Sequence, residues 1–144
     1  MFWLYFDTFI WFLWQLPQNL IALLMMLFLG KKTLVRFENY TWIFVCDRMN
    51  GGVSLGNFIF LSPQSNKEAT IRHELGHVIQ SHIFGWVYLF IIGLPSLFWA
   101  MFCPRSKCYY EFFTEQWAND LAGLKVSKNQ YGCYLYIPKD DNDK

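Results

Sequence analysis

Two long apolar stretches divide the chain, with a more polar segment between them. Residues Thr8 to Gly30 are 23 consecutive positions without Asp, Glu, Lys or Arg, and a helix needs about 20 apolar residues to cross a bilayer. A second charge-free stretch runs from Leu75 to Pro104. This pattern predicts two membrane segments, an anchor over 1–30 and an apolar hairpin over 83–104. A very aromatic soluble core is the alternative.

The flanks of these stretches set their expected topology. The first has no basic residues before it and no small-x-small cleavage site after it, so we expect a retained anchor rather than a signal peptide. Basic residues follow both stretches, and positive-inside bias places both exits on the cytoplasmic face. The second stretch must then turn back, and we expect that turn at Pro95. The flanking basic residues are Lys31, Lys32, Arg36, Arg105 and Lys107.

The segment between the stretches predicts a β-hairpin and the start of a helix. Thr33–Asp47 and Val53–Ser62 are rich in β-branched and aromatic residues, and the turn signal Arg48–Gly52 separates them. Ser65 and Glu68 then match a capping box, which predicts a helix beginning there.

Composition narrows the function classes and the domain count. Aromatic residues make up 21% of the chain and charged residues 16%, whereas soluble domains carry roughly 25% charged residues. A net charge of +1 gives no field to hold a polyanion, so nucleic acid is not an expected partner. The length of 144 residues suits one domain, which we assign to 31–144, after the anchor 1–30.

The predicted helix carries an H-E-x-x-H motif, from His73 through Glu74 to His77. At about 100° per residue the two histidines lie about 40° apart, one turn along, so both imidazoles can reach one metal ion. Glu74 is offset from them, which suits a group that holds the water of the metal. The pattern predicts Zn²⁺, with His73 and His77 as ligands and Glu74 as catalytic base. His82 falls on the apolar stripe of the helix and is not predicted to be a ligand.

A catalytic zinc site takes three protein ligands, and a helix predicted over 109–126 offers the third. Glu115 lies away from the apolar stripe of that helix, beside Ala118, whose small side chain would let another helix come close. Glu111 shares this face and is the alternative ligand. Asn119, one turn after Glu115, is the expected hydrogen-bond partner of a ligand histidine, whereas Asp120 points far round the helix.

Together these motifs resemble those of gluzincins. The run His73–His77 followed by Glu115–Asp120 is similar to the pattern H-E-L-G-H with E-x-x-A-D in membrane proteases related to the CAAX prenyl protease and its bacterial heat-shock counterpart. The chain also resembles a small uncharacterised bacterial family of that type, and Gly51–Phe60 resembles the strand before the active helix. The resemblance covers roughly residues 50–82 and 110–123.

The resemblance implies His73, His77 and Glu115 as zinc ligands and Glu74 as catalytic base. The family has Asp where this chain has Asn119, and Asp120 comes one place later. Both residues therefore stay candidates for the partner of a ligand histidine.

The predicted fold class is α+β and membrane-associated. It is a minimal zincin-like core of β-hairpin, H-E-x-x-H helix and glutamate helix, with two apolar membrane segments. The expected function is a zinc-dependent membrane-bound metallopeptidase that hydrolyses peptide bonds in membrane-proximal or unfolded protein segments. We expect it at the bacterial inner membrane, with its site on the cytoplasmic face. A catalytically inactive, metal-stabilised membrane adaptor or pseudoprotease is the alternative.

The expected partners are a protein or peptide substrate and membrane lipid, and the first apolar segment offers a route to a homo-oligomer. Tyr109, Tyr110 and Tyr131 are available as oxyanion-stabilising donors, although the aromatic richness of the chain favours packing or interfacial anchoring for each of them. The four cysteines form no C-x-x-C pair, so neither a thiolate zinc site nor a structural disulfide is expected. They are Cys46, Cys103, Cys108 and Cys133.

Overall fold

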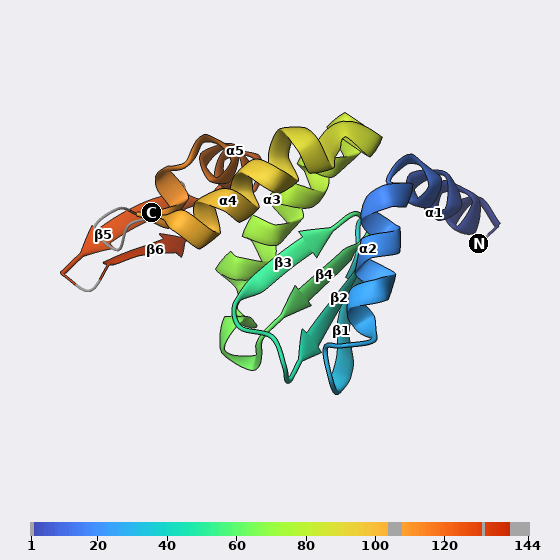
Figure 1. Cartoon of the computed structure of the whole chain (residues 1–144), viewed down its shortest axis with the longest axis horizontal. Coiled ribbons are helices and arrows are strands. Elements are labelled where there is room, and N and C mark those ends of the chain that lie inside the picture. The colour runs from blue at the N-terminus through green and yellow to red at the C-terminus, as the bar shows by residue number, and fades with distance from the viewer. Residues whose placement is uncertain (1, 104–107, 131, 139–144) are drawn as a thin grey trace, which may run out of the picture.

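A computed structural model describes residues 2–103, 108–130 and 132–138 of the chain (Figure 1). The longer helices in these ranges are α1 (Phe2–Trp14), α2 (Leu16–Met26), α3 (Glu68–Phe84), α4 (Leu94–Phe102) and α5 (Phe113–Leu121). The strands are β1 (Lys32–Glu38), β2 (Thr41–Cys46), β3 (Gly52–Leu55), β4 (Phe58–Leu61), β5 (Lys125–Asn129) and β6 (Gly132–Tyr136). Short 3₁₀ turns are η1 (Pro63–Ser65), η2 (Gly85–Val87) and η4 (Tyr109–Glu111), and η3 (Leu89–Gly93) is a π-helix.

The first four strands form one sheet in the order β1-β2-β4-β3. β1 pairs antiparallel with β2, β2 pairs parallel with β4, and β3 pairs antiparallel with β4. The prediction of a single hairpin is therefore wrong, because each of its two predicted strands is itself a hairpin. Asn39 and Tyr40 turn the first with φ of 49° and 61°, the left-handed conformation that a two-residue hairpin turn requires. The surrounding β-formers hide this turn in the sequence.

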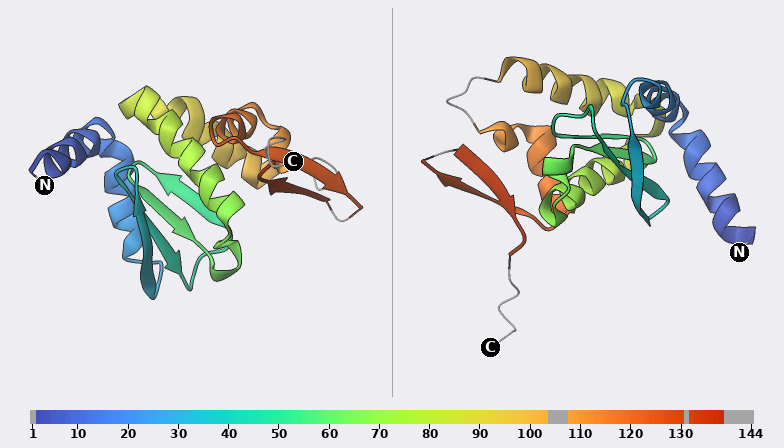
Figure 2. Two further views of the ribbon diagram at one scale, coloured as in Figure 1. Left: turned by 180° about the vertical axis from the view of Figure 1, so that it is seen from behind. Right: turned by 90° about the horizontal axis from the view of Figure 1, so that it is seen from below.

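Helices cover both faces of the sheet (Figures 1 and 2). Phe58 and Phe60 of β4 pack toward α2, where Ala22 belongs to the same buried cluster. The alternate residues, Ile59 and Leu61, pack with Ile71 and Val78 of α3 in a second buried cluster. Because strand side chains alternate between faces, one fully buried strand joins the two clusters, and the sheet fixes the position of α3.

The start of α3 differs from the sequence-based expectation. The helix begins at Glu68 without a side-chain cap. Ser65 is instead hydrogen-bonded to Ser62, over 2.9 Å between the hydroxyl oxygens. Glu68 forms ion pairs with Arg36 and Arg72. The predicted capping box is therefore wrong, because each of its members has another partner.

The prediction of two membrane segments, and with it the membrane-associated fold class, is wrong for this structure. Within residues 2–103, 108–130 and 132–138, no helix combines the length and the hydropathy needed to cross a membrane. The first apolar stretch is divided at Gln15 into α1 and α2. The second is divided at Gly85, whose φ of 52° ends α3.

Buried polar side chains explain why the first stretch packs against the sheet. Gln15, Gln18 and Asn19 are all fully buried. The Asn19 amide donates to Asn57 Oδ1 over 3.0 Å and its Oδ1 accepts from the Asn57 backbone N–H over 2.8 Å. Gln18 donates to the carbonyl oxygen of Gly85. These amides tie the first stretch to the β3–β4 turn and to the end of α3.

Core packing uses only part of the apolar surface of the two stretches. Leu27, Phe90 and Phe102 are exposed by 75%, 71% and 70% respectively. Their exposure shows that these stretches are more apolar than the described core requires. The membrane location of the chain stays a prediction, and Arg105 and Lys107, which support its orientation, lie outside the described residues.

The chain doubles back at η2, and α4 returns along the same side of the domain as α5 (Figure 1). The reversal therefore lies near Gly85 and not at Pro95 as expected. Pro95 occupies the first turn of α4, directly after the π-helix η3. This reversal places α4 against the segment that leads into α5.

The C-terminal part departs from the predicted helix over 109–126. Only Phe113–Leu121 is α-helical, Gly123 follows with φ of 65°, and β5 and β6 form an antiparallel hairpin. A disulfide joins Cys108 to Cys133. The expectation of no structural disulfide is therefore wrong, because the hairpin returns Cys133 to the beginning of the glutamate segment.

A close approach of α3 and α5 depends on Gly76. A Cβ atom at Gly76 would lie 2.2 Å from the carbonyl oxygen of Ala118, so we expect Gly76→Ala to lower the free energy of unfolding by about 1–3 kcal/mol or more. Gly93→Ala is the matched control, because the nearest atom to its added Cβ lies at 3.5 Å. The control should be neutral or stabilising by up to about 1 kcal/mol. Urea denaturation measures both, and equal midpoints would contradict the close approach.

Candidate metal centre

Three potential metal ligands meet between α3 and α5. Nε2 of His73 and Nε2 of His77 each lie 3.2 Å from Oε2 of Glu115. The three potential ligand atoms all lie within 4.8 Å of one another. The residues are 4%, 7% and 0% exposed respectively. The structure therefore brings together the three residues that the sequence selects as ligands.

The local sequence explains why these side chains converge. Ile71 and Val78 hold one side of α3 against the sheet, which turns His73 and His77 toward α5 because helical side chains repeat every 3.6 residues. Glu115 lies in the first turn of α5, at the level that the Gly76 contact fixes. The helical spacing within α3 and within α5 thus brings together side chains that lie far apart in the sequence.

The ring orientation of His73 is fixed by Asn119. Nδ1 of His73 lies 2.7 Å from Oδ1 of Asn119, and an amide oxygen only accepts hydrogen bonds. Nδ1 therefore carries a proton, and Nε2 faces Glu115, protonated when it donates to the carboxylate and deprotonated when it ligates a metal ion. Asp120 is exposed and takes no part in the cluster. Asn119 Nδ2 is buried with no hydrogen-bond partner among the described residues.

Gln80 holds the second histidine and was missed by the sequence reasoning. Its Oε1 lies 2.8 Å from Nδ1 of His77, and its Nε2 donates to the carbonyl oxygen of Thr114 over 2.9 Å. Because that carbonyl only accepts, the amide orientation is fixed, Gln80 Oε1 accepts from Nδ1 of His77, and Nε2 is the ring nitrogen directed at the cluster. The three-residue spacing from His77 to Gln80 on one helix face was the available signal.

The donor types and two of the donor distances suit a tetrahedral zinc ion. With bonds of about 2.0–2.1 Å, neighbouring donors of a tetrahedral ion lie roughly 3.3 Å apart. The two distances from histidine Nε2 to Glu115 Oε2, 3.2 Å each, match that edge, and the three ligand atoms all lie within 4.8 Å of one another. Two imidazoles with engaged Nδ1 atoms and one carboxylate are also a donor set that zinc accepts with an open fourth position.

The electrostatics of the cluster favour a cation at this position. Burial raises the pKa of Glu115, but hydrogen bonds from His73 and His77 outweigh it and hold that pKa below its usual range. Burial lowers the pKa of His77, but its hydrogen bond to Glu115 and the negative charges of Glu115 and Glu74 together outweigh this, and the net shift is upward. The buried carboxylate therefore requires positive charge beside it, which protons or a metal ion can supply.

Glu74 lies between the cluster and β3. A Cβ atom at Gly52 would lie 2.6 Å from Oε1 of Glu74, so the missing side chain of Gly52 makes room for this carboxylate. Burial raises the pKa of Glu74, although His73 and His77 oppose the shift and so does a hydrogen bond with Ser54. A buried carboxylate of raised pKa is suited to accept a proton near neutral pH.

Tyrosines surround the cluster. The ring of Tyr110 meets His73 edge-on with centroids 5.3 Å apart, and Tyr109 forms a side-chain hydrogen bond with Glu115. Burial raises the pKa of Tyr109 and that of Tyr88, so both hydroxyls stay protonated donors. Tyr88 comes from the second apolar stretch, where no sequence signal marked it. Tyr131 lies outside the described residues.

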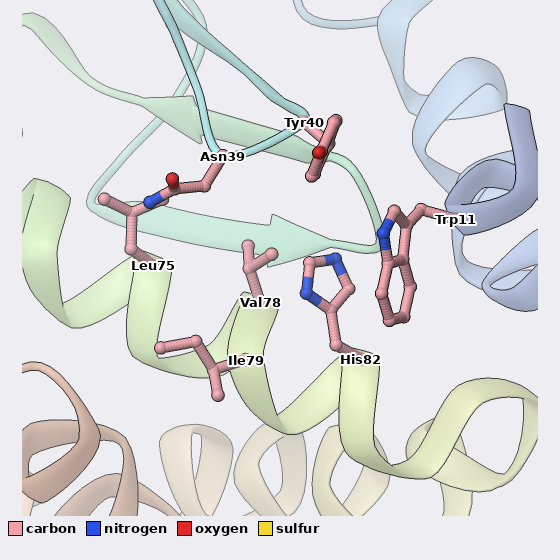
Figure 3. A pocket seen from close by; sticks show the side chains of 7 residues that line it. All are labelled: Trp11, Asn39, Tyr40, Leu75, Val78, Ile79 and His82. Atoms are coloured by element: carbon pink, nitrogen blue, oxygen red, sulfur yellow. The ribbon is translucent and has the colours of Figure 1, made fainter. Parts of the chain in front are cut away.

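Two other candidates lie away from the cluster. Glu111, the alternative third ligand, is exposed and forms an ion pair with Lys128. His82 lines a cavity of about 250 Å³ on the sheet side of α3, next to the ring of Trp11 (Figure 3). This cavity is separate from the metal cluster, because His73 and His77 do not line it.

Comparison of the chain with protein-family models, with curated proteins and with solved structures gave no match. The resemblance to gluzincins therefore stays a prediction, based on the motifs at His73–His77 and Glu115–Asp120.

Zinc affinity should distinguish Asn119 from its neighbour. We expect Asn119→Ala to weaken zinc binding by about 10–100-fold, because the His73 ring loses the acceptor that orients it. Asn119→Asp should bind zinc at least as tightly as the wild type, because a carboxylate still accepts from Nδ1 and removes the unpartnered amide N–H. Asp120→Ala is the control and should change nothing. Competition with a chromophoric chelator measures all three, and equal effects at both positions would contradict this assignment.

Proposed function

We propose that this chain is a zinc-dependent metallopeptidase. The observation that carries the proposal is the convergence of His73 Nε2, His77 Nε2 and Glu115 Oε2, with each histidine Nδ1 held by an amide oxygen. Both histidines are thereby pre-organised to ligate through Nε2. Buried structural histidines also need hydrogen-bond partners, so the feature that favours a metal site is the convergence of both Nε2 atoms on one carboxylate oxygen.

The chemistry follows from the donor set and from Glu74. When bound, zinc supplies Lewis-acid chemistry, which polarises the scissile carbonyl and makes a water molecule acidic near pH 7. Glu74 accepts the proton of that water and passes it to the leaving amine. Glu74 is buried beside His73 and His77, so the proposed base lies in the same polar interior as the candidate ligands.

An edge strand beside Glu74 supports a peptide as the substrate. β3 is the last strand of the four-stranded sheet, so one side of its backbone is not used in strand pairing. An extended peptide can add to such an edge through main-chain hydrogen bonds. β4 lies inside the sheet and cannot serve in this way, so only the β3 part of the predicted strand Val53–Ser62 offers an edge. Unfolded or extended protein segments are the substrate class that we propose.

The test of this function is Glu74→Gln. We expect the variant to keep one zinc ion per chain and to lose cleavage by on the order of 10²–10⁴-fold, because glutamine cannot accept the proton. Glu68→Gln is the matched control on the same helix, since Glu68 is exposed and pairs with Arg36 and Arg72. Cleavage of a fluorescein-labelled unfolded protein is measured beside zinc content. Undiminished cleavage in Glu74→Gln would exclude this mechanism.

A metal-stabilised adaptor or pseudoprotease is the second candidate function, and the burial of the site favours it. His73, Glu74, His77 and Glu115 are all less than 8% exposed, so a substrate reaches them only if surrounding side chains move. This candidate predicts stoichiometric zinc, a lower melting temperature after chelation, and no cleavage in the wild type. The assay described for Glu74→Gln separates the two candidates through its wild-type arm.

A further inference from the structure

A chain of hydroxyl groups leads from the second apolar stretch to Glu115. Ser96, in the first turn of α4, donates to the Thr114 hydroxyl over 2.7 Å. The Thr114 hydroxyl donates to Oε1 of Glu115 over 3.3 Å. Thr114 is fully buried, and its carbonyl oxygen accepts the Gln80 amide. Thr114 is thus held by both α3 and α4.

The two carboxylate oxygens of Glu115 therefore have different partners. Oε2 faces Nε2 of both histidines, whereas Oε1 accepts from the Thr114 hydroxyl. We infer that Ser96 and Thr114 are positioning residues that restrict Glu115 to coordination through one oxygen. This inference rests on the proposed function, because it presumes that the cluster holds a metal ion.

α4 also contacts the segment before Glu115 through Trp99. Trp99, one turn after Ser96, donates from its indole to the carbonyl oxygen of Tyr109 over 2.9 Å. Its ring also stacks on Phe112, with centroids 4.9 Å apart. Ser96 and Trp99 lie three residues apart and so share one face of the helix. The second apolar stretch thereby makes two hydrogen bonds to the segment that carries Glu115, one from Ser96 and one from Trp99.

The number of oxygens that ligate the ion has a chemical consequence. Two imidazole nitrogens and one carboxylate oxygen leave the fourth tetrahedral position for water or substrate. If both oxygens of Glu115 reached the ion, the site would hold four protein donors before any water. By engaging Oε1, the hydroxyl chain keeps the open position that hydrolysis requires.

The test removes each hydroxyl group and measures zinc affinity and Co²⁺ absorption. We expect Thr114→Val to weaken zinc binding by about 10–100-fold, the usual effect of removing an outer partner of a ligand. With Co²⁺ in place of zinc, the intense visible absorption of a four-coordinate site should weaken as a fifth donor is added. Thr114→Ser restores the hydroxyl and should restore both readouts. Ser96→Ala should shift them in the same direction by a smaller amount, and the double variant should show no more than the Thr114→Val effect.

Thr41→Val is the matched control, because Thr41 is also fully buried and its hydroxyl bonds to the carbonyl oxygen of Asn39 over 3.2 Å. It should leave Co²⁺ absorption and zinc affinity unchanged. Wild-type spectra and affinity in a folded Thr114→Val would overturn the inference while the proposed function stands. If Thr114→Val does not fold, Ser96→Ala decides by the same criterion. A wild-type protein that binds neither ion would overturn the proposed function itself.

Discussion

The contact of two histidine Nε2 atoms with one carboxylate oxygen of Glu115, at 3.2 Å each, is the constraint on which the rest of the site depends. It exists only because α5 reaches α3 at Gly76, where any side chain would meet the carbonyl oxygen of Ala118. A buried carboxylate between two imidazoles is stable only with positive charge beside it. The close packing of α3 and α5 therefore creates both the buried cluster and its requirement for a cation.

Hydrogen bonds turn this contact into a defined donor set. Asn119 and Gln80 each accept from an Nδ1 atom, and Thr114 engages the second oxygen of Glu115. All three candidate ligands are thus oriented by residues from α3 or α5, and Ser96 extends the support to α4. In a metal site such outer contacts typically change metal affinity by about 10–100-fold, a role that would account for these polar residues in an otherwise apolar interior.

The sequence was informative where chemistry and helical period coincide. His73, His77 and Glu115 were selected by spacing, and Asn119 by its place one turn after Glu115. The β-topology was not predictable, because the turn at Asn39–Tyr40 lacks glycine and proline and lies among strong β-formers.

The membrane segments were wrong because hydropathy counts apolar residues and cannot show which amides are satisfied inside the protein. Gln15 and Asn19 are buried against Asn57, and Gly85 ends α3 by its backbone conformation.

X-ray absorption at the zinc edge of purified, zinc-loaded protein is the direct test of whether two histidines and one carboxylate hold the ion. A site made of His73, His77 and Glu115 should give one zinc ion per chain, with multiple scattering from two imidazoles, nitrogen or oxygen donors at about 2.0–2.1 Å and no sulfur. A shell at about 2.3 Å from cysteine, or scattering from fewer than two imidazoles, would contradict it.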